Sequence, residues 1–161
     1  MDPLQIVDIL SRILHVGTAI VLAGGSVFLR YVVMPAAGPL PEAEHDEFRS
    51  RLIGRWKRVV HIGVTLLLVT GFYNYYRGIG AHEGDSLYHA LIGTKMLLAF
   101  AVFFIAAALV GRSAKLEGMR TQRGKWLTIA ILLVAIIVSI SGFLKIRSTK
   151  GLASPPVTAP R

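Results

Sequence analysis

The chain has no cysteine and carries few charged residues. Without a thiol among its 161 residues, it has no disulfide, no iron–sulfur ligation and no thiolate metal site, although this leaves its redox compartment open. Only 17% of the residues are charged, whereas a soluble domain carries about a quarter. The first residues also lack the basic stretch that precedes the apolar core of a signal peptide, so we expect no cleavable leader.

Apolar residues make up 53% of the chain and fall into four long blocks. The blocks cover residues 13–33, 59–76, 90–110 and 126–144. Each approaches the ~20 residues that a helix needs to cross a bilayer, while a barrel strand needs only about 9–11. The sequence therefore predicts an all-α integral membrane protein with one domain over residues 1–147. This domain is a bundle of four transmembrane helices at about residues 7–34, 56–77, 88–112 and 124–146.

The residues outside the blocks predict the orientation of the bundle. The first and third connections hold eleven of the eighteen lysines and arginines, so the positive-inside rule places them in the cytoplasm and both termini outside. This topology and an attraction to anionic lipid explain the net charge of +9, so the lipid bilayer is an expected partner and nucleic acid is not. Residues 148–161 are expected to form a disordered tail.

The first connection is rich in proline. We expect Pro35, Pro39 and Pro41 to break the first helix. Residues 42–55 then have the pattern of a short amphipathic helix, with Glu47 and Arg51 four residues apart. This helix either lies on the cytoplasmic surface of the membrane and leads into the second span, or is simply a solvated charged helix.

Two ionisable residues, His15 and Lys95, lie inside apolar blocks. A lysine at the centre of a bilayer costs about 2.5–3.5 kcal/mol, so Lys95 requires a partner, a water-filled cavity or an anionic ligand. It lies roughly 10 Å below Tyr88 on the same face of its helix, and His15 lies at a similar depth in the outer half of the membrane. We therefore expect a site in which Lys95 is the catalytic residue and His15 and Tyr88 bind a cofactor.

Two further histidines are candidate cofactor ligands. His61 lies about a turn and a half inside the cytoplasmic end of the second helix, too far from His15 to bind the same atom, so it would serve a second site. His89 has the right depth, but it lies about 120° around its helix from Lys95. Each of these histidines can instead be a residue that only forms a hydrogen bond between packed helices.

Three segments of the chain resemble a superfamily of bacterial membrane proteins. The first helix carries Leu14-His15-Val16-Gly17-Thr18-Ala19 and then Gly24-Gly25, the second begins Arg55-Trp56-Lys57-Arg58 and ends Val69-Thr70-Gly71, and the third carries Tyr88-His89-Ala90-Leu91-Ile92-Gly93-Thr94-Lys95. In this order and spacing they are similar to the four-helix superfamily of copper-resistance protein D and the membrane haem-containing protoporphyrinogen oxidase. The resemblance covers residues from about 10 to 145 and implies a multi-pass protein of the bacterial inner (plasma) membrane.

The resemblance to the oxidase implies a haem-dependent oxidoreductase with a redox partner. The histidine of its first helix and the lysine of its third correspond to His15 and Lys95. His15 would then be an axial ligand of haem b, and Lys95 would pair with a propionate of haem or of a tetrapyrrole substrate. The chain departs from the family's pattern at His89, which stands in place of a glycine, and at His61, so both are further candidate haem ligands.

Two other functions stay open. The resemblance to copper-resistance protein D implies copper binding or transport, with His15 as a metal ligand, but the candidate thioether ligands Met34, Met96 and Met119 are scattered. A gated copper pore would also require a homo-oligomer. The third possibility is a structural or assembly protein whose polar residues only lock helices together. Haem would give a Soret band, copper would be found as metal in the purified protein, and a structural protein would show neither.

Overall fold

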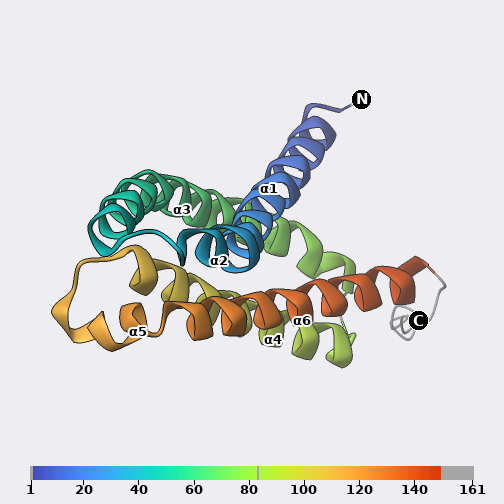
Figure 1. The fold of residues 1–161 in the computed structure, drawn as a ribbon. Coiled ribbons are helices and arrows are strands. Elements are labelled where there is room, and N and C mark those ends of the chain that lie inside the picture. Colours follow the sequence, from blue (N-terminus) through green and yellow to red (C-terminus); the bar gives the residue numbers. More distant parts are fainter. Residues whose placement is uncertain (1, 83, 150–161) are drawn as a thin grey trace, which may run out of the picture.

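The computed structural model describes residues 2–82 and 84–149, which are almost entirely helical (Figure 1). Its long helices are α1 (Pro3–Phe28), α3 (Glu42–Ile79), α4 (Ser86–Val110) and α6 (Arg123–Thr149). Short elements connect them: the π-helical turn η1 (Leu29–Val33), α2 (Met34–Ala37), the 3-10 turns η2 (Gly80–His82) and η3 (Ala114–Leu116), and α5 (Glu117–Thr121). The described part of the chain contains no strand.

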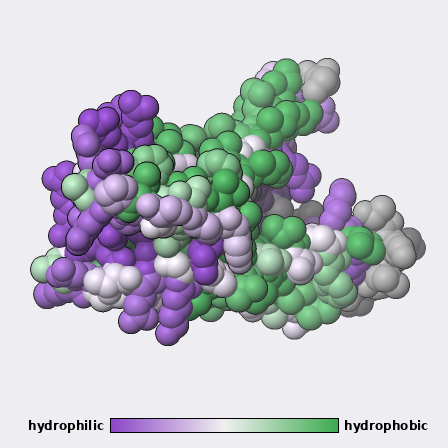
Figure 2. All heavy atoms as spheres, in the orientation of Figure 1, coloured by the Kyte–Doolittle hydropathy of each residue, from purple (hydrophilic) through white to green (hydrophobic). Residues whose placement is uncertain are grey.

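Four helices of the bundle are long and apolar enough to cross a membrane, which confirms the predicted all-α class and its four candidate spans. Their large apolar side chains point outwards: Leu97 is 73% exposed, Ile20 66% and Val69 64%. Figure 2 shows apolar side chains over the middle of the molecule and hydrophilic side chains gathered over α5 and the start of α3. An apolar outer surface of this extent suits lipid as the surrounding solvent.

Consecutive long helices run in opposite directions, so the bundle has two ends (Figure 1). We call one the Asp85 end, where α1 and α4 begin and α3 and α6 end. We call the other the α5 end, which holds the two connections rich in basic residues. Helix α6 continues to Thr149, beyond the predicted end of the last span, and residues 150–161 of the predicted tail lie outside the described residues.

The prediction that Pro35 breaks the first helix was wrong. Helix α1 passes into the π-helical turn η1, whose last bond runs from the Met34 N–H to the Leu29 carbonyl, and the chain stays helical to Ala37. Pro35 lies in the first turn of α2, where a residue without an N–H is tolerated. The wider π turn lets the chain continue past the proline, and the helix ends only before Pro39.

Residues 42–55 form no separate surface helix but are the beginning of α3. The predicted pair of Glu47 and Arg51 is present on this segment, and Glu42 and Glu44 stabilise its first turn through the helix dipole. Helix α3 has 38 residues and is therefore ~57 Å long, almost twice the ~30 Å thickness of a hydrocarbon core. It is one continuous rod because no proline interrupts it after Pro41.

The helices pack mainly as two pairs, α1 with α3 and α4 with α6, and α3 contacts α4 between them. Glycines allow α1 and α3 to approach closely: the Trp56 ring fills the place where a Cβ on Gly25 would lie, and Leu22 lies over Gly63 in the same way. The buried cluster between α4 and α6 consists of Ile105, Leu109, Leu127 and Ala130. The N-terminal half of α1 stands away from α6 (Figure 1).

Candidate functional site

Polar side chains line the contact between α1 and α3 near the Asp85 end. We call this contact the polar seam; it consists of Asp8, Ser11 and His15 on α1 and of Thr70, Tyr73, Asn74 and Arg77 on α3. Residues three, four and seven positions apart lie on one face of a helix, so each set forms a single stripe. Because α1 and α3 are antiparallel, the two stripes meet in opposite order along the chain.

The outer part of the seam is an ion pair with additional hydrogen bonds. Arg77 donates from Nε to Asp8 Oδ1 at 3.0 Å and from Nη2 to Oδ2 at 2.8 Å, and the Tyr73 hydroxyl donates to Asp8 Oδ1 at 2.8 Å. One turn deeper, the Ser11 hydroxyl donates to Asn74 Oδ1 at 3.2 Å. Forked arginine–carboxylate pairs fix geometry as well as charge, so this part of the seam sets the register of α1 against α3.

His15 is the deepest residue of the seam on α1. Its Nδ1 lies 2.8 Å from Thr70 Oγ1, and Thr70 Oγ1 in turn lies 2.6 Å from the Leu66 carbonyl oxygen. A hydroxyl has one hydrogen, which Thr70 donates to Leu66, so Thr70 must accept from the Nδ1–H of His15. In the neutral imidazole, this hydrogen bond keeps the proton on Nδ1 and leaves the lone pair on Nε2, which has no hydrogen-bond partner among the described residues.

The backbone of α3 lies close to the imidazole ring of His15. A Cβ added to Gly71 would be 3.2 Å from the His15 Cε1 atom, closer than an ordinary van der Waals contact. Thr70 is only 6% exposed, so the acceptor that holds the ring is itself fixed by packing. The buried Thr70 hydroxyl and the neighbouring Gly71 backbone therefore restrict the orientation of the ring.

Lys95 comes from α4 toward the same region, as its depth predicted. It lies within electrostatic range of His15 and of Arg12, which is one turn before His15 on α1. Neither Lys95 nor Arg12 forms a hydrogen bond or an ion pair with any residue that the structure describes. The site therefore combines an imidazole with two cations that no carboxylate of the described residues neutralises, and this arrangement can attract an anionic group.

Tyr88 lies nearer to the Asp85 end. Its ring stacks on His82 with 3.8 Å between ring centroids and 6° between the ring planes, and a Cβ on Gly78 would be 3.0 Å from its hydroxyl oxygen. Its charge environment includes Arg12, so it belongs to the rim of the same site rather than to its centre. The predicted face shared by Tyr88 and Lys95 thus leads from the end of the bundle toward His15.

A second ion pair fixes the Asp85 end. Asp85 caps α4 by accepting from the Tyr88 N–H at 3.1 Å, and Arg147 of α6 donates to its two carboxylate oxygens at 2.9 and 2.6 Å. The two side chains are 7% and 14% exposed, respectively. The hydrogen bond from Arg147 is the main reason that the pKa of Asp85 lies below its usual value.

The other two candidate histidines lie apart from this site. His61 is exposed and bonds through Nδ1 to the Lys57 carbonyl of its own helix at 2.7 Å. His89 is exposed and bonds through Nε2 to the His82 carbonyl at 3.1 Å. Within residues 2–82 and 84–149, no three histidine, aspartate or glutamate side chains gather as a metal site would require.

Most of the seam was not anticipated from the sequence. Asp8, Ser11, Tyr73 and Arg77 were missed, although Asn74 lies in the expected region. The signal was present in the spacing, because Thr70, Tyr73, Asn74 and Arg77 are separated by three, four and seven positions and form a helical polar stripe. No protein-family model, curated protein or solved structure matches this chain.

Proposed function

We propose that the chain is a multi-pass protein of the bacterial inner membrane, with both termini outside, that binds haem b through His15. Haem would serve electron transfer or the oxidation of a small molecule such as a tetrapyrrole. The free Nε2 lone pair of His15 is the single observation that carries the proposal. A histidine that binds a metal through one ring nitrogen usually donates a hydrogen bond from the other, and this bond fixes the tautomer and the orientation of the ring.

The donor set favours haem over copper. A porphyrin already supplies most of the ligands of its iron, so one histidine is a sufficient protein ligand. A copper ion held by protein alone requires several imidazole, thiolate or thioether donors. The chain has no cysteine, and its described residues form no cluster of three histidine, aspartate or glutamate side chains.

Lys95 and Arg12 fit the anionic part of such a cofactor. Haem and its tetrapyrrole relatives carry propionates, and a carboxylate beside Lys95 would offset the cost of a lysine at this depth. We assign Lys95 the role of binding and orienting a propionate of haem or of substrate, with Arg12 as a second cation at the same place. Tyr88 lies between this position and the Asp85 end.

The chain's own residues set the environment of the iron. Bound haem supplies one-electron chemistry, and an external redox partner exchanges those electrons. Thr70 holds the imidazole in the ligating tautomer, and Gly71 leaves room for the ring to keep its orientation. His15 and Lys95 are partly buried between the helices, and burial is one of the factors that set a haem potential.

The visible spectrum of the detergent-purified protein tests the proposal. Protein from haem-sufficient cells should show a b-type spectrum in the oxidised and reduced states. His15→Ala should abolish it, while His61→Ala, which removes an exposed histidine bonded to its own helix, should leave it unchanged. A colourless wild-type protein, or a spectrum that survives in His15→Ala, would overturn the assignment.

Replacement of Lys95 separates a cofactor site from a purely structural one. Lys95→Met keeps the length of the side chain and removes its charge, so haem binding should weaken by about tenfold or more if an ion pair to a propionate is lost. Lys57→Met is the matched control at the other end of the bundle. If Lys95→Met binds haem as the wild type does, Lys95 is not the propionate partner.

A further inference from the structure

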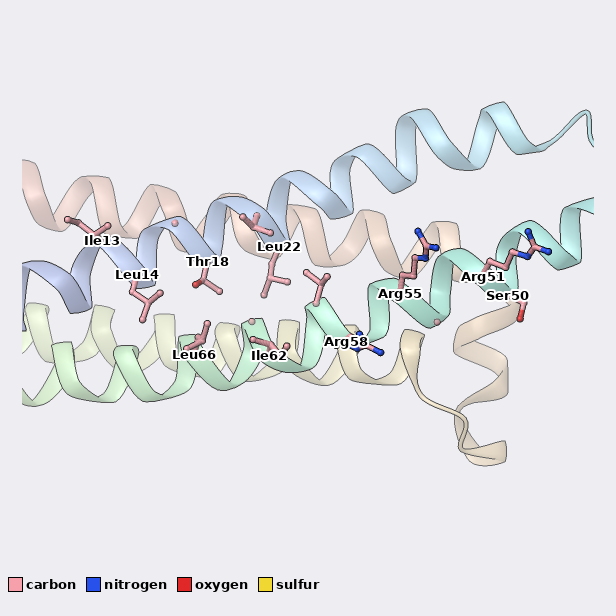
Figure 3. A pocket seen from close by; sticks show the side chains of 15 residues that line it. Ile13, Leu14, Thr18, Leu22, Ser50, Arg51, Arg55, Arg58, Ile62 and Leu66 are labelled. Carbon is pink, nitrogen blue, oxygen red and sulfur yellow. The ribbon is translucent and has the colours of Figure 1, made fainter.

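A long groove lies between α1 and α3 and extends from the level of His15 toward the α5 end. Its volume is about 1030 Å³, at the upper end of the ~300–1,000 Å³ typical of ligand pockets. Figure 3 shows Leu14 and Thr18 of α1 directed toward Ile62 and Leu66 of α3. Ile13 and Leu22 of α1 also line the groove. The groove is therefore apolar over most of its length.

One end of the groove is strongly basic. Arg51, Arg55 and Arg58 of α3 line it there, together with Ser50 (Figure 3). Arg51 is paired with Glu47, but Arg55 and Arg58 form no hydrogen bond or ion pair with any described residue. Arg55 and Arg58 are thus available to bind an anion at this end of the groove.

Each apolar wall of the groove is about as long as one leaflet of a bilayer is thick. From Arg58 to Leu66 the helix rises ~12 Å, and from Ile13 to Leu22 it rises ~14 Å. Half of a hydrocarbon core is about 15 Å thick. With the apolar walls at the depth of acyl chains, the arginines lie at the level of the headgroups of the leaflet at the α5 end.

Two residues in the walls of the groove are glycines, which have no side chain to narrow it. A Cβ on Gly17 or on Gly54 would have no atom within 4 Å. Both glycines line the groove, one on each helix. The space is therefore open to a bound molecule and is not filled by the packing of α1 against α3.

We propose that the groove binds an anionic phospholipid, with an acyl chain against the apolar walls and the phosphate at Arg55 and Arg58. Guanidinium groups bind phosphate through paired N–H donors, which makes arginine suited to this role. A second copy of the chain is disfavoured as the occupant, because each copy carries a net charge of +9 and would bring further positive charge to a basic mouth. The inference does not depend on haem binding, since neither His15 nor Lys95 nor Arg12 lines the groove.

Native mass spectrometry of the full chain in detergent tests the proposal. The probes are phosphatidylglycerol and phosphatidylcholine with identical acyl chains, added in equal amounts. The wild type should retain phosphatidylglycerol at least tenfold more than phosphatidylcholine. Arg55→Gln/Arg58→Gln should lose this preference, while Arg112→Gln/Lys115→Gln, which removes two exposed charges from the other connection at the α5 end, should keep it.

A variant that leaves the charges in place tests the acyl-chain part of the site. Gly17→Leu puts a side chain into the groove and raises helix propensity, so the helix itself is not weakened. It should lower retention of both lipids, with unchanged helical content by circular dichroism. Equal retention of both lipids by the wild type, an unchanged preference in the double arginine variant, or a dimer that excludes lipid would overturn the proposal. Displacement of the lipid by inorganic phosphate at equal concentration would also overturn it.

Discussion

At the scale of single residues, the hydroxyl of Thr70 decides the chemistry of His15. Its hydrogen goes to the Leu66 carbonyl, so its lone pair receives the Nδ1–H of the imidazole. Thr70→Val keeps the shape of the side chain and removes this acceptor. Haem affinity should fall by about 10–100-fold, as for other supports of metal-bound histidines, and a haem titration followed at the Soret band measures the loss.

Thr65 provides the matched control for that variant. Its hydroxyl donates to the His61 carbonyl in the same i to i−4 geometry, but it holds no imidazole nitrogen. Thr65→Val should therefore leave haem affinity within about a factor of two of the wild type, because the His61 carbonyl keeps its backbone hydrogen bond within the helix. An equal loss in both variants would mean that helix stability, not the tautomer of His15, limits binding.

The positions of His15 and Lys95 were predictable from the sequence, whereas the pairing around them was not. Depth follows from the fixed rise of a helix, so two polar residues in long apolar blocks can be placed along the membrane normal. Rotation about the helix axis is set by packing between helices. The contacts of Trp56 with Gly25 and of Leu22 with Gly63 fix this rotation. Which side chain contacts which glycine cannot be predicted from the sequence.

At the scale of helices, two neighbouring glycines of α1 should respond oppositely to the same change. A Cβ on Gly25 would meet the Trp56 ring, so Gly25→Ala overpacks the contact between α1 and α3 and should destabilise the protein by about 1–3 kcal/mol. Gly24 has no atom within 4 Å of the same position. Gly24→Ala should therefore be neutral or stabilising by up to about 1 kcal/mol.

Denaturation of both glycine variants in detergent, followed by circular dichroism, checks this prediction. Trp56 fluorescence should change in Gly25→Ala and not in Gly24→Ala, because only the former pushes the ring. If both variants lose the same stability, the close approach of α1 and α3 is not what holds this pair of helices together.

The ion pair of Asp85 and Arg147 predicts how stability depends on pH. The folded state lowers the pKa of Asp85 through the hydrogen bond from Arg147, so the unfolded chain binds a proton more readily. The stabilisation is fully present above the unfolded pKa of about 3.9 and is lost as the pH falls through the lower folded value. Melting curves between pH 2 and about pH 7 should show a decline in this acidic window.

Arg147→Gln and Asp85→Asn should both remove part of that decline and lower the melting temperature by a few degrees at neutral pH. Asp85→Asn keeps a residue that caps α4, so a loss in this variant reports the ion pair rather than the cap. Arg112→Gln, an exposed change elsewhere, should leave the acidic decline as it is. A decline that persists in both pair variants would assign it to other carboxylates.

The spans were predictable as elements because their apolar blocks are long, but their limits were not. The polar segment before the span extends α3 to 38 residues, and hydropathy does not detect helix outside the membrane. The π turn before Pro35 could not be predicted either, because a proline in a sequence indicates the end of a helix and only packing between helices favours a π turn instead. The ends of α4, by contrast, lie within two residues of the predicted limits.

At the scale of the whole molecule, the absence of cysteine makes the orientation directly measurable. Ser86→Cys introduces the only thiol at the Asp85 end, and Ser113→Cys introduces it at the α5 end. With both termini outside, a membrane-impermeant maleimide should label Ser86→Cys in intact cells and Ser113→Cys only after permeabilisation. The cysteine-free parent gives the background, and the reverse pattern would contradict the predicted orientation.

The continuity of α3 has a mechanical consequence. Thr70, which orients the imidazole, and Arg58, at the mouth of the groove, lie on one rod about 18 Å apart. Because no hinge separates these two points, a force on the first turns of α3 would tilt the helix as a rigid body. A tilt of α3 against α1 would move the Thr70 hydroxyl, and the distance from Thr70 Oγ1 to His15 Nδ1 is the quantity that such a tilt would change.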